Sequence, residues 1–223
     1  MRNAVLGIDT STDVCAGVAV DGRPVASGMV ADRRAHAEQL TPLVQRVLAE
    51  AGLGFSDLGA IAVGVGPGPF TGLRVGVATA AVLAETLGVP IRGVCSLDVV
   101  ASQFVNRAQV IGSDFLVVAD ARRKELYWAQ YSPDGARVAG PFVTAPTEVP
   151  PLWVVGPGAR LYALDGLLVD GPDCLDAGHL AAVSDRLPEA GLEPLYLRRP
   201  DADVPTTRKS TLLQPRLATM RKR

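Results

Sequence analysis

The first third of the chain carries two hydrophobic patterns in succession. Residues 4–8, 15–20 and 23–30 form short extended runs of strand length, and the last two are joined by an Asp-Gly pair typical of hairpin turns. Between residues 40 and 51, apolar positions recur at three- and four-residue steps. The pattern predicts three antiparallel strands followed by an amphipathic helix.

A continuous apolar run over residues 58–65 predicts a buried strand. It leads into a glycine- and proline-rich turn and a second helix, within the stretch VGVGPGPFTGLRVGVATA at residues 63–80. We expect this helix to end at about Gly88, before a proline. A short strand follows, and then a third helix from Ser96, which we predict as its N-cap, to about Asn106.

Residues 114–140 repeat the opening pattern, with a strand, a polar turn, a second strand and a Pro-Asp-Gly turn into a third. Further along the chain, WVVGPG echoes the earlier VGVGPG. A structural duplication explains both echoes. We therefore predict a first domain over residues 1–108, a second over residues 109–200, and a basic tail over residues 201–223 that lacks periodicity.

Composition and charge narrow the class of protein. The formal net charge is −1, and no uninterrupted apolar run reaches the ~18 residues of a membrane helix, so neither a nucleic-acid nor a membrane surface is indicated overall. The amino terminus lacks the pattern of a signal peptide. Three scattered cysteines without a C-x-x-C pair indicate reduced thiols and argue against a zinc site. We expect a cytoplasmic protein.

The glycine-rich turn matches neither common phosphate loop. A Walker A loop requires a lysine that this turn lacks, and a G-x-G-x-x-G fingerprint fails at its third glycine. The helix after the turn is more informative. Gly72, Gly76 and Ala80 recur four residues apart with Thr79 beside them, which leaves one face nearly bare backbone.

Two interpretations of this helix stay open. In the first, it is the central helix of its own domain and is buried on every side. In the second, one side packs on its own sheet while the small-residue side meets a helix of another protein chain. The aliphatic face of the preceding helix would then supply the rest of the contact.

The polar turn after the first strand, GIDTS, contains Asp9, Thr10 and Ser11, the side chains that a phosphate-and-magnesium loop uses. An ordinary hairpin turn explains them equally well. The corresponding turn in the second half, ADARRKE, is basic. It could bind an anion, or it could be a solvent-exposed hairpin tip. The basic tail could likewise contact RNA phosphates or simply be solvated.

Candidates for catalysis are weak. His36 is followed one turn later by Leu40, so a helix with two metal-binding histidines is absent. With only two histidines in the chain and no local triad signature, we identify no catalytic residue and no metal site.

Five segments together resemble the TsaB family, also called YeaZ: GIDTS, HAEQLTP, GPGPFTGLRVG, DARRKELYWAQY and EPLYLRRP. The resemblance covers about residues 4–200. It implies an α/β fold of the actin-like and sugar-kinase-like type, duplicated, with two mixed-sheet subdomains. It also implies a non-catalytic subunit of the bacterial machinery that makes threonylcarbamoyladenosine (t6A) beside the anticodon of tRNA, with no cofactor, metal or protease activity of its own.

The resemblance further implies partners. TsaB forms a heterodimer with the related transferase TsaD, and the pair recruits the ATPase TsaE, so ATP and metal are expected on these partners and tRNA is reached through the complex. TsaB alone forms a homodimer. The first two helices of each chain build both dimers, which assigns the interface here to Leu40, Leu43, Val44, Val47, Gly72, Gly76, Thr79 and Ala80.

A second function is compatible with the same fold. An ATP-binding phosphotransferase would use Asp9, Thr10 and Ser11 to hold magnesium and phosphate between the two domains. In a TsaB-like protein the same turn would be a vestigial phosphate loop.

Overall fold

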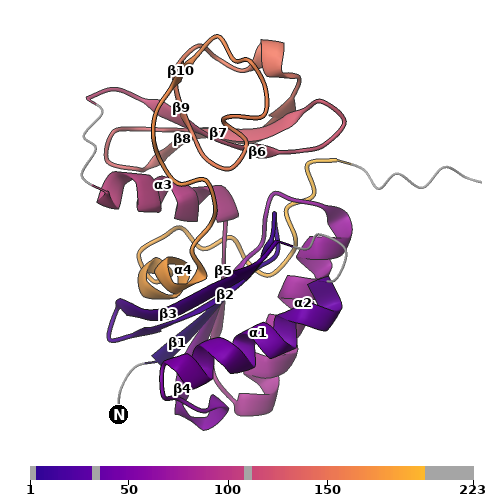
Figure 1. The fold of residues 1–223 in the computed structure, drawn as a ribbon, viewed down its shortest axis with the longest axis vertical. Helices are drawn as coiled ribbons and strands as arrows, with labels where there is room; N and C mark the ends of the chain where they lie inside the picture. Colours follow the sequence, from indigo (N-terminus) through magenta and orange to yellow (C-terminus); the bar gives the residue numbers. More distant parts are fainter. Residues whose placement is uncertain (1–3, 32–35, 108–111, 199–223) are drawn as a thin grey trace, which may run out of the picture.

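A computed structural model describes residues 4–31, 36–107 and 112–198. In this part of the chain, two five-stranded sheets are stacked with helices between them (Figure 1). The first sheet has the order β3-β2-β1-β4-β5 and the second has the order β10-β9-β6-β7-β8. The strands are β1 (Ala4–Asp9), β2 (Val14–Val20), β3 (Arg23–Val30), β4 (Leu58–Gly64), β5 (Ile91–Val94), β6 (Phe115–Asp120), β7 (Leu126–Tyr131), β8 (Arg137–Thr144), β9 (Trp153–Val155) and β10 (Leu167–Leu168).

The two sheets share one connectivity. In each, the first three strands pair antiparallel, and the fourth and fifth then join parallel on the other side of the first strand. The predicted duplication and both three-stranded meanders are therefore confirmed. The fold is the expected duplicated actin-like α/β fold with two mixed sheets.

Helices cover both faces of the first sheet. On one face lie α1 (His36–Glu50) and α2 (Phe70–Leu87), and on the other lies α4 (Ala177–Val183). Two short 3-10 helices, Phe55–Asp57 and Pro146–Glu148, lie in connections. The predicted end of α2 is confirmed, since Gly88 caps it with a left-handed backbone (φ 67°).

Alternation along β1 explains how the first sheet is covered. Leu6 and Ile8 are fully buried in the core beneath α1 and α2. Gly7 points to the other face, where a Cβ would lie 2.1 Å from the carbonyl oxygen of Ala177. Gly17 is paired with Gly7 across the strands and is equally close to α4. The missing side chains let the backbone of α4 rest directly on the sheet.

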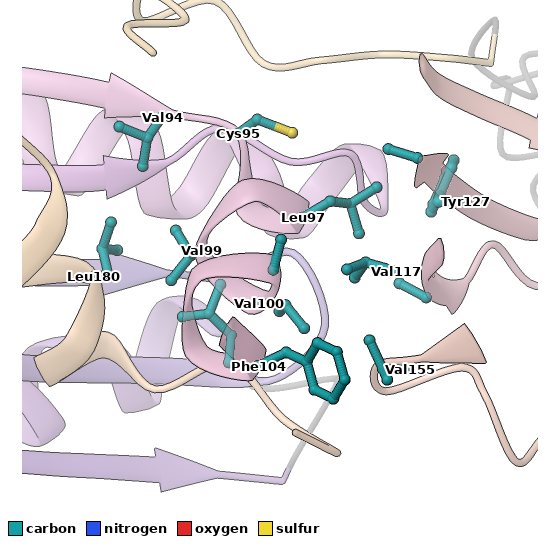
Figure 2. Packing of buried hydrophobic residues seen from close by; sticks show 14 of the residues in the cluster. Val94, Cys95, Leu97, Val99, Val100, Phe104, Val117, Tyr127, Val155 and Leu180 are labelled. Atoms are coloured by element: carbon teal, nitrogen blue, oxygen red, sulfur yellow. The ribbon is translucent and has the colours of Figure 1, made fainter. Parts of the chain in front are cut away.

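The helix between the two halves is α3 (Ser96–Asn106). Figure 2 shows Leu97, Val100 and Phe104 pointing toward the second sheet, where Val117 and Val155 meet them. Its opposite side faces α4 and the first sheet. One apolar core therefore spans both halves through α3.

The predicted domain limits need one correction. The helix α4 follows β10 in the chain but packs on β1, β2 and β3 of the first sheet. Beyond it, the backbone N–H groups of Ala190 and Leu195 donate to Gly93 and Val65 at 2.9 and 2.8 Å. The end of the range 109–200 thus completes the first half. The boundary at 108/109 and the tail 201–223 lie outside the described residues.

Candidate functional site

The start of the turn between β1 and β2 is closed to solvent. Asp9 and Thr10 are fully buried, and Ser11 is nearly so. The Asp9 Oδ1 atom accepts hydrogen bonds from the backbone N–H of Ser11 at 2.8 Å and from its hydroxyl at 2.6 Å. The hydroxyl of Thr10 donates to the carbonyl oxygen of Gly72 in α2 at 2.7 Å. The turn is therefore bonded to its own helix.

Ser96 closes the turn from the side of α3. Its hydroxyl donates to Asp9 Oδ2 at 2.5 Å and accepts from the backbone N–H of Gly66 at 3.1 Å. The prediction that Ser96 is the N-cap is wrong: Cys95 takes that position, and Ser96 is the first helical residue. Its hydroxyl is used for this long-range contact rather than for capping the helix.

The glycines form the wall against which this turn packs. A Cβ at Gly64 would lie 1.8 Å from Asp9 Oδ2, one at Gly68 would lie 2.6 Å from the carbonyl oxygen of Ser11, and one at Gly76 would lie 2.2 Å from the hydroxyl oxygen of Thr10. The glycine-rich turn and the bare face of α2 therefore serve to accommodate the β1–β2 turn of the same chain.

This packing sets the chemistry of Asp9. Burial raises the pKa of its carboxyl, while the hydrogen bonds from Ser11 and Ser96 oppose the shift. Both carboxylate oxygens are already bonded within the protein. Because Asp9 is also fully buried, the arrangement disfavours magnesium binding by Asp9 and with it the phosphotransferase alternative. In the described part of the chain, no cluster of His, Cys, Asp and Glu has the geometry to hold a metal ion.

The residues predicted for the partner interface lie mostly inside the monomer. The aliphatic side chains of α1 pack on β2 and β3 of their own sheet, and the small residues of α2 face the β1–β2 turn and β4. Of the eight predicted residues only Thr79 is half-exposed; the buried ones are Leu40, Leu43, Val44, Val47, Gly72, Gly76 and Ala80. These seven residues pack α1 and α2 against their own sheet. That α1 and α2 bind a partner stays a prediction.

The outer side of α2 is the surface that another chain could reach. It runs along Thr71, Arg74, Ala78, Val82 and Glu85, all exposed. Val82 is 62% exposed and is among the most exposed large hydrophobic side chains of the described residues. The interpretation that α2 is buried on every side is therefore wrong, although one side does pack on its own sheet.

Sequence reasoning missed this outer strip because α2 is apolar around most of its circumference. The stripe of glycines was the available signal, since the exposed strip lies opposite it on the helix. By length and composition, α2 is also the one helix among the described residues that could span a bilayer. Its close packing on Thr10 and on β4 instead accounts for its apolar character.

Comparison with known proteins agrees with this fold. Residues 30–164, more than half of the chain, match the family model of TsaD, tRNA N6-adenosine threonylcarbamoyltransferase. An uncharacterized protein of Mycobacterium tuberculosis is 48% identical over 208 residues, which are 90% of this chain and 94% of that protein.

Two further relatives carry the name TsaB or YeaZ. The tRNA threonylcarbamoyladenosine biosynthesis protein TsaB of Escherichia coli is 34% identical over 130 residues, which are 58% of this chain and 55% of that protein. The structure of YeaZ from Pseudomonas aeruginosa is 28% identical, with a TM-score of 0.70 over 87% of this chain and 100% of that one. The chain therefore belongs to the TsaD family, as a TsaB/YeaZ-like member.

Proposed function

We propose that this chain is the non-catalytic subunit of the bacterial t6A machinery, acting in the cytoplasm. In this proposal it forms a heterodimer with TsaD through α1 and α2, and the pair recruits TsaE to modify the adenosine beside the anticodon. The transferase chemistry, the ATP and the metal belong to the partner subunits. The name of the Escherichia coli relative, tRNA threonylcarbamoyladenosine biosynthesis protein, supports the pathway.

The observation that carries the proposal is the contrast between the two sides of α2. The inner side is filled by the β1–β2 turn, whose Asp9 is fully buried and bonded to Ser96 and Ser11. The outer side presents Ala78 and the exposed Val82 between Arg74 and Glu85. A turn sealed in this way suits a supporting role, and an apolar helix surface with charged ends suits a protein partner.

The surface proposed for the partner extends from the outer side of α2 to α1. Its exposed residues Thr41, Pro42, Gln45 and Ala49 lie on the side away from the sheet. The helices α1 and α2 lie beside each other on one face of the first sheet (Figure 1). A partner helix would therefore contact the outer side chains of both helices rather than their buried faces.

The test is light scattering on size-exclusion fractions of the chain alone and mixed with TsaD of the same organism. The variant is Val82→Glu, which places a charge in the centre of the outer strip. The matched control is Val138→Glu on β8 of the second sheet, where the valine is 56% exposed. We expect the native chain and the control to pair with TsaD and Val82→Glu to bind at least about tenfold more weakly.

A second measurement tests which subunit catalyses the transfer. Transfer of the threonylcarbamoyl group from threonylcarbamoyl-AMP to tRNA is measured with TsaD in the presence of each variant. We expect Val82→Glu to require a correspondingly higher concentration to stimulate TsaD and Asp9→Asn to behave as the native chain, because Asp9 is given no chemical role. Unchanged pairing by Val82→Glu would contradict the interface, and transfer by this chain without TsaD would contradict the non-catalytic role.

A further inference from the structure

A second turn in the molecule occupies the same topological place as the sealed one. It connects β6 to β7, and its Asp120 Oδ1 accepts from the backbone N–H of Arg122 at 2.7 Å. Asp9 and the N–H of Ser11 make the same contact in the first half. Unlike the first turn, this one exposes three consecutive basic side chains, Arg122, Arg123 and Lys124.

The backbone of this turn is strained. Arg122, Arg123 and Lys124 have φ angles of 59°, 51° and 61°, a left-handed conformation that costs about 1–2 kcal/mol for each residue with a side chain. Backbone hydrogen bonds from Glu125 to Arg122 and from Ala121 to Glu125 hold it. Strain of this kind concentrates at sites that bind something.

The turn forms one wall of a cavity of about 170 Å³. The glycine turn before α2 forms the second wall, and the C-terminal segment around Tyr196 and Arg198 forms the third. Three arginines line the cavity, Arg122, Arg123 and Arg198. The acids that offset them are Asp120 in the lining and Glu125, which pairs with Arg198, so a net positive charge remains. The first turn of α2 contributes no acidic residue. The electrostatic balance of the cavity therefore favours an anion.

Contacts between the walls fix the shape of the cavity. The hydroxyl of Tyr127 donates to the carbonyl oxygen of Gly68 at 3.4 Å. The rings of Phe70 and Tyr196 lie 4.8 Å apart, and Arg74 stacks on Phe70 while its Nε donates to the Tyr196 hydroxyl. Arg198 forms an ion pair with Glu125 at the base of the basic turn. The cavity lies between the two halves of the molecule, and these contacts fix its shape without a ligand.

We propose that this cavity binds a phosphate group, through the guanidinium groups of Arg122, Arg123 and Arg198. Arginine suits this role because its planar fork of five N–H donors can bond a phosphate while one edge is engaged elsewhere. The volume fits a phosphate or pyrophosphate but is below the ~300 Å³ of pockets that enclose whole organic ligands. The rest of a larger ligand would lie outside.

The phosphate could come from a free ligand or from the backbone of an RNA strand, and the experiment separates these sources. The full-length native chain is titrated with pyrophosphate and with ATP in a calorimeter at low salt. It is also titrated with a labelled single-stranded RNA oligonucleotide, followed by fluorescence anisotropy. Binding of pyrophosphate and ATP identifies a free ligand, whereas binding of RNA alone identifies a phosphodiester.

The test variant is the double substitution Arg122→Gln/Arg123→Gln. Its control is Arg46→Gln/Arg160→Gln, which removes the same charge from two exposed arginines elsewhere. We expect the test variant to bind at least about tenfold more weakly and the control to stay within about twofold. With RNA, the slope of log affinity against log salt should fall by about 0.7 for each phosphate that the variant no longer neutralises.

Arg198→Gln provides an independent check from the opposite wall and should weaken binding in the same assay. Thermal unfolding of each variant verifies the fold. The tail is intact in every variant, so differences between variants report on the cavity. The proposal is overturned if the native chain binds none of the three probes, or if the control loses as much affinity as the test variant. It does not rest on the proposed function, because no assay includes TsaD.

Discussion

Asp9 and Asp120 occupy equivalent positions, each at the end of the first strand of its sheet and each in the last pair of a hairpin. Both accept a hydrogen bond from the N–H two residues later. Asp9 is nevertheless fully buried, whereas Asp120 is half-buried beside a basic cavity. The same local turn chemistry has two outcomes, depending on what packs above it.

The difference comes from the connections between strands. In the first half, the chain between β3 and β4 contains α1, and the chain between β4 and β5 forms α2 over the β1–β2 turn. In the second half, only the 3-10 helix Pro146–Glu148 follows β8, and irregular chain joins β9 to β10. The half with helices buries the start of its turn beneath α2. The half without them leaves its turn open.

The largest expected effect comes from removing the two aspartates. Asp9→Ala leaves the buried donors of Ser11 and Ser96 without an acceptor, so we expect the free energy of unfolding to fall by about 2–4 kcal/mol. Asp120→Ala, in the half-buried turn, should cost less than about 1 kcal/mol. Urea unfolding of both variants measures the contrast. Equal losses would mean that burial of the first turn does not distinguish the two halves.

A smaller effect is expected at the contact between α2 and the sealed turn. Gly76→Ala places a methyl group against the hydroxyl of Thr10, and this overpacking should cost about 1–3 kcal/mol. Adding Thr10→Ala makes room, so the double variant should lose less stability than the two single losses combined. Gly54→Ala, where the nearest atom is 3.7 Å away, is the control. Additive losses would contradict the direct contact.

The smallest effect concerns pH. Because burial raises the folded-state pKa of Asp9, folding favours its neutral form, and stability should decline as pH rises from about 4 through that raised pKa. Asp9→Asn should therefore flatten the pH dependence of unfolding in this window. Chemical denaturation at a series of pH values tests this. An unaltered slope in Asp9→Asn would show that its burial does not govern the titration.

Much of the fold follows from local signals. The extended runs and the Asp-Gly and Pro-Asp-Gly turns predicted the strands of both meanders, and the Gly-Pro-Gly echo marked the same point of each half. The site was harder to predict. The face of α1 that carries Leu43 and Val47 was correctly identified as apolar, but periodicity does not say whether such a face meets the chain's own sheet or another protein.

Local sequence specified the strands of both meanders, the duplication and the small residues at Gly64, Gly68 and Gly76, because backbone preferences and residue size act over a few positions. Long-range packing, by contrast, brings the hydroxyl of Ser96 onto Asp9, 87 positions away in the chain. Long-range packing also returns α4 to the first sheet and pairs Arg198 with Glu125 at the end of the β6–β7 turn. These features depend on long-range contacts, which no local pattern specifies.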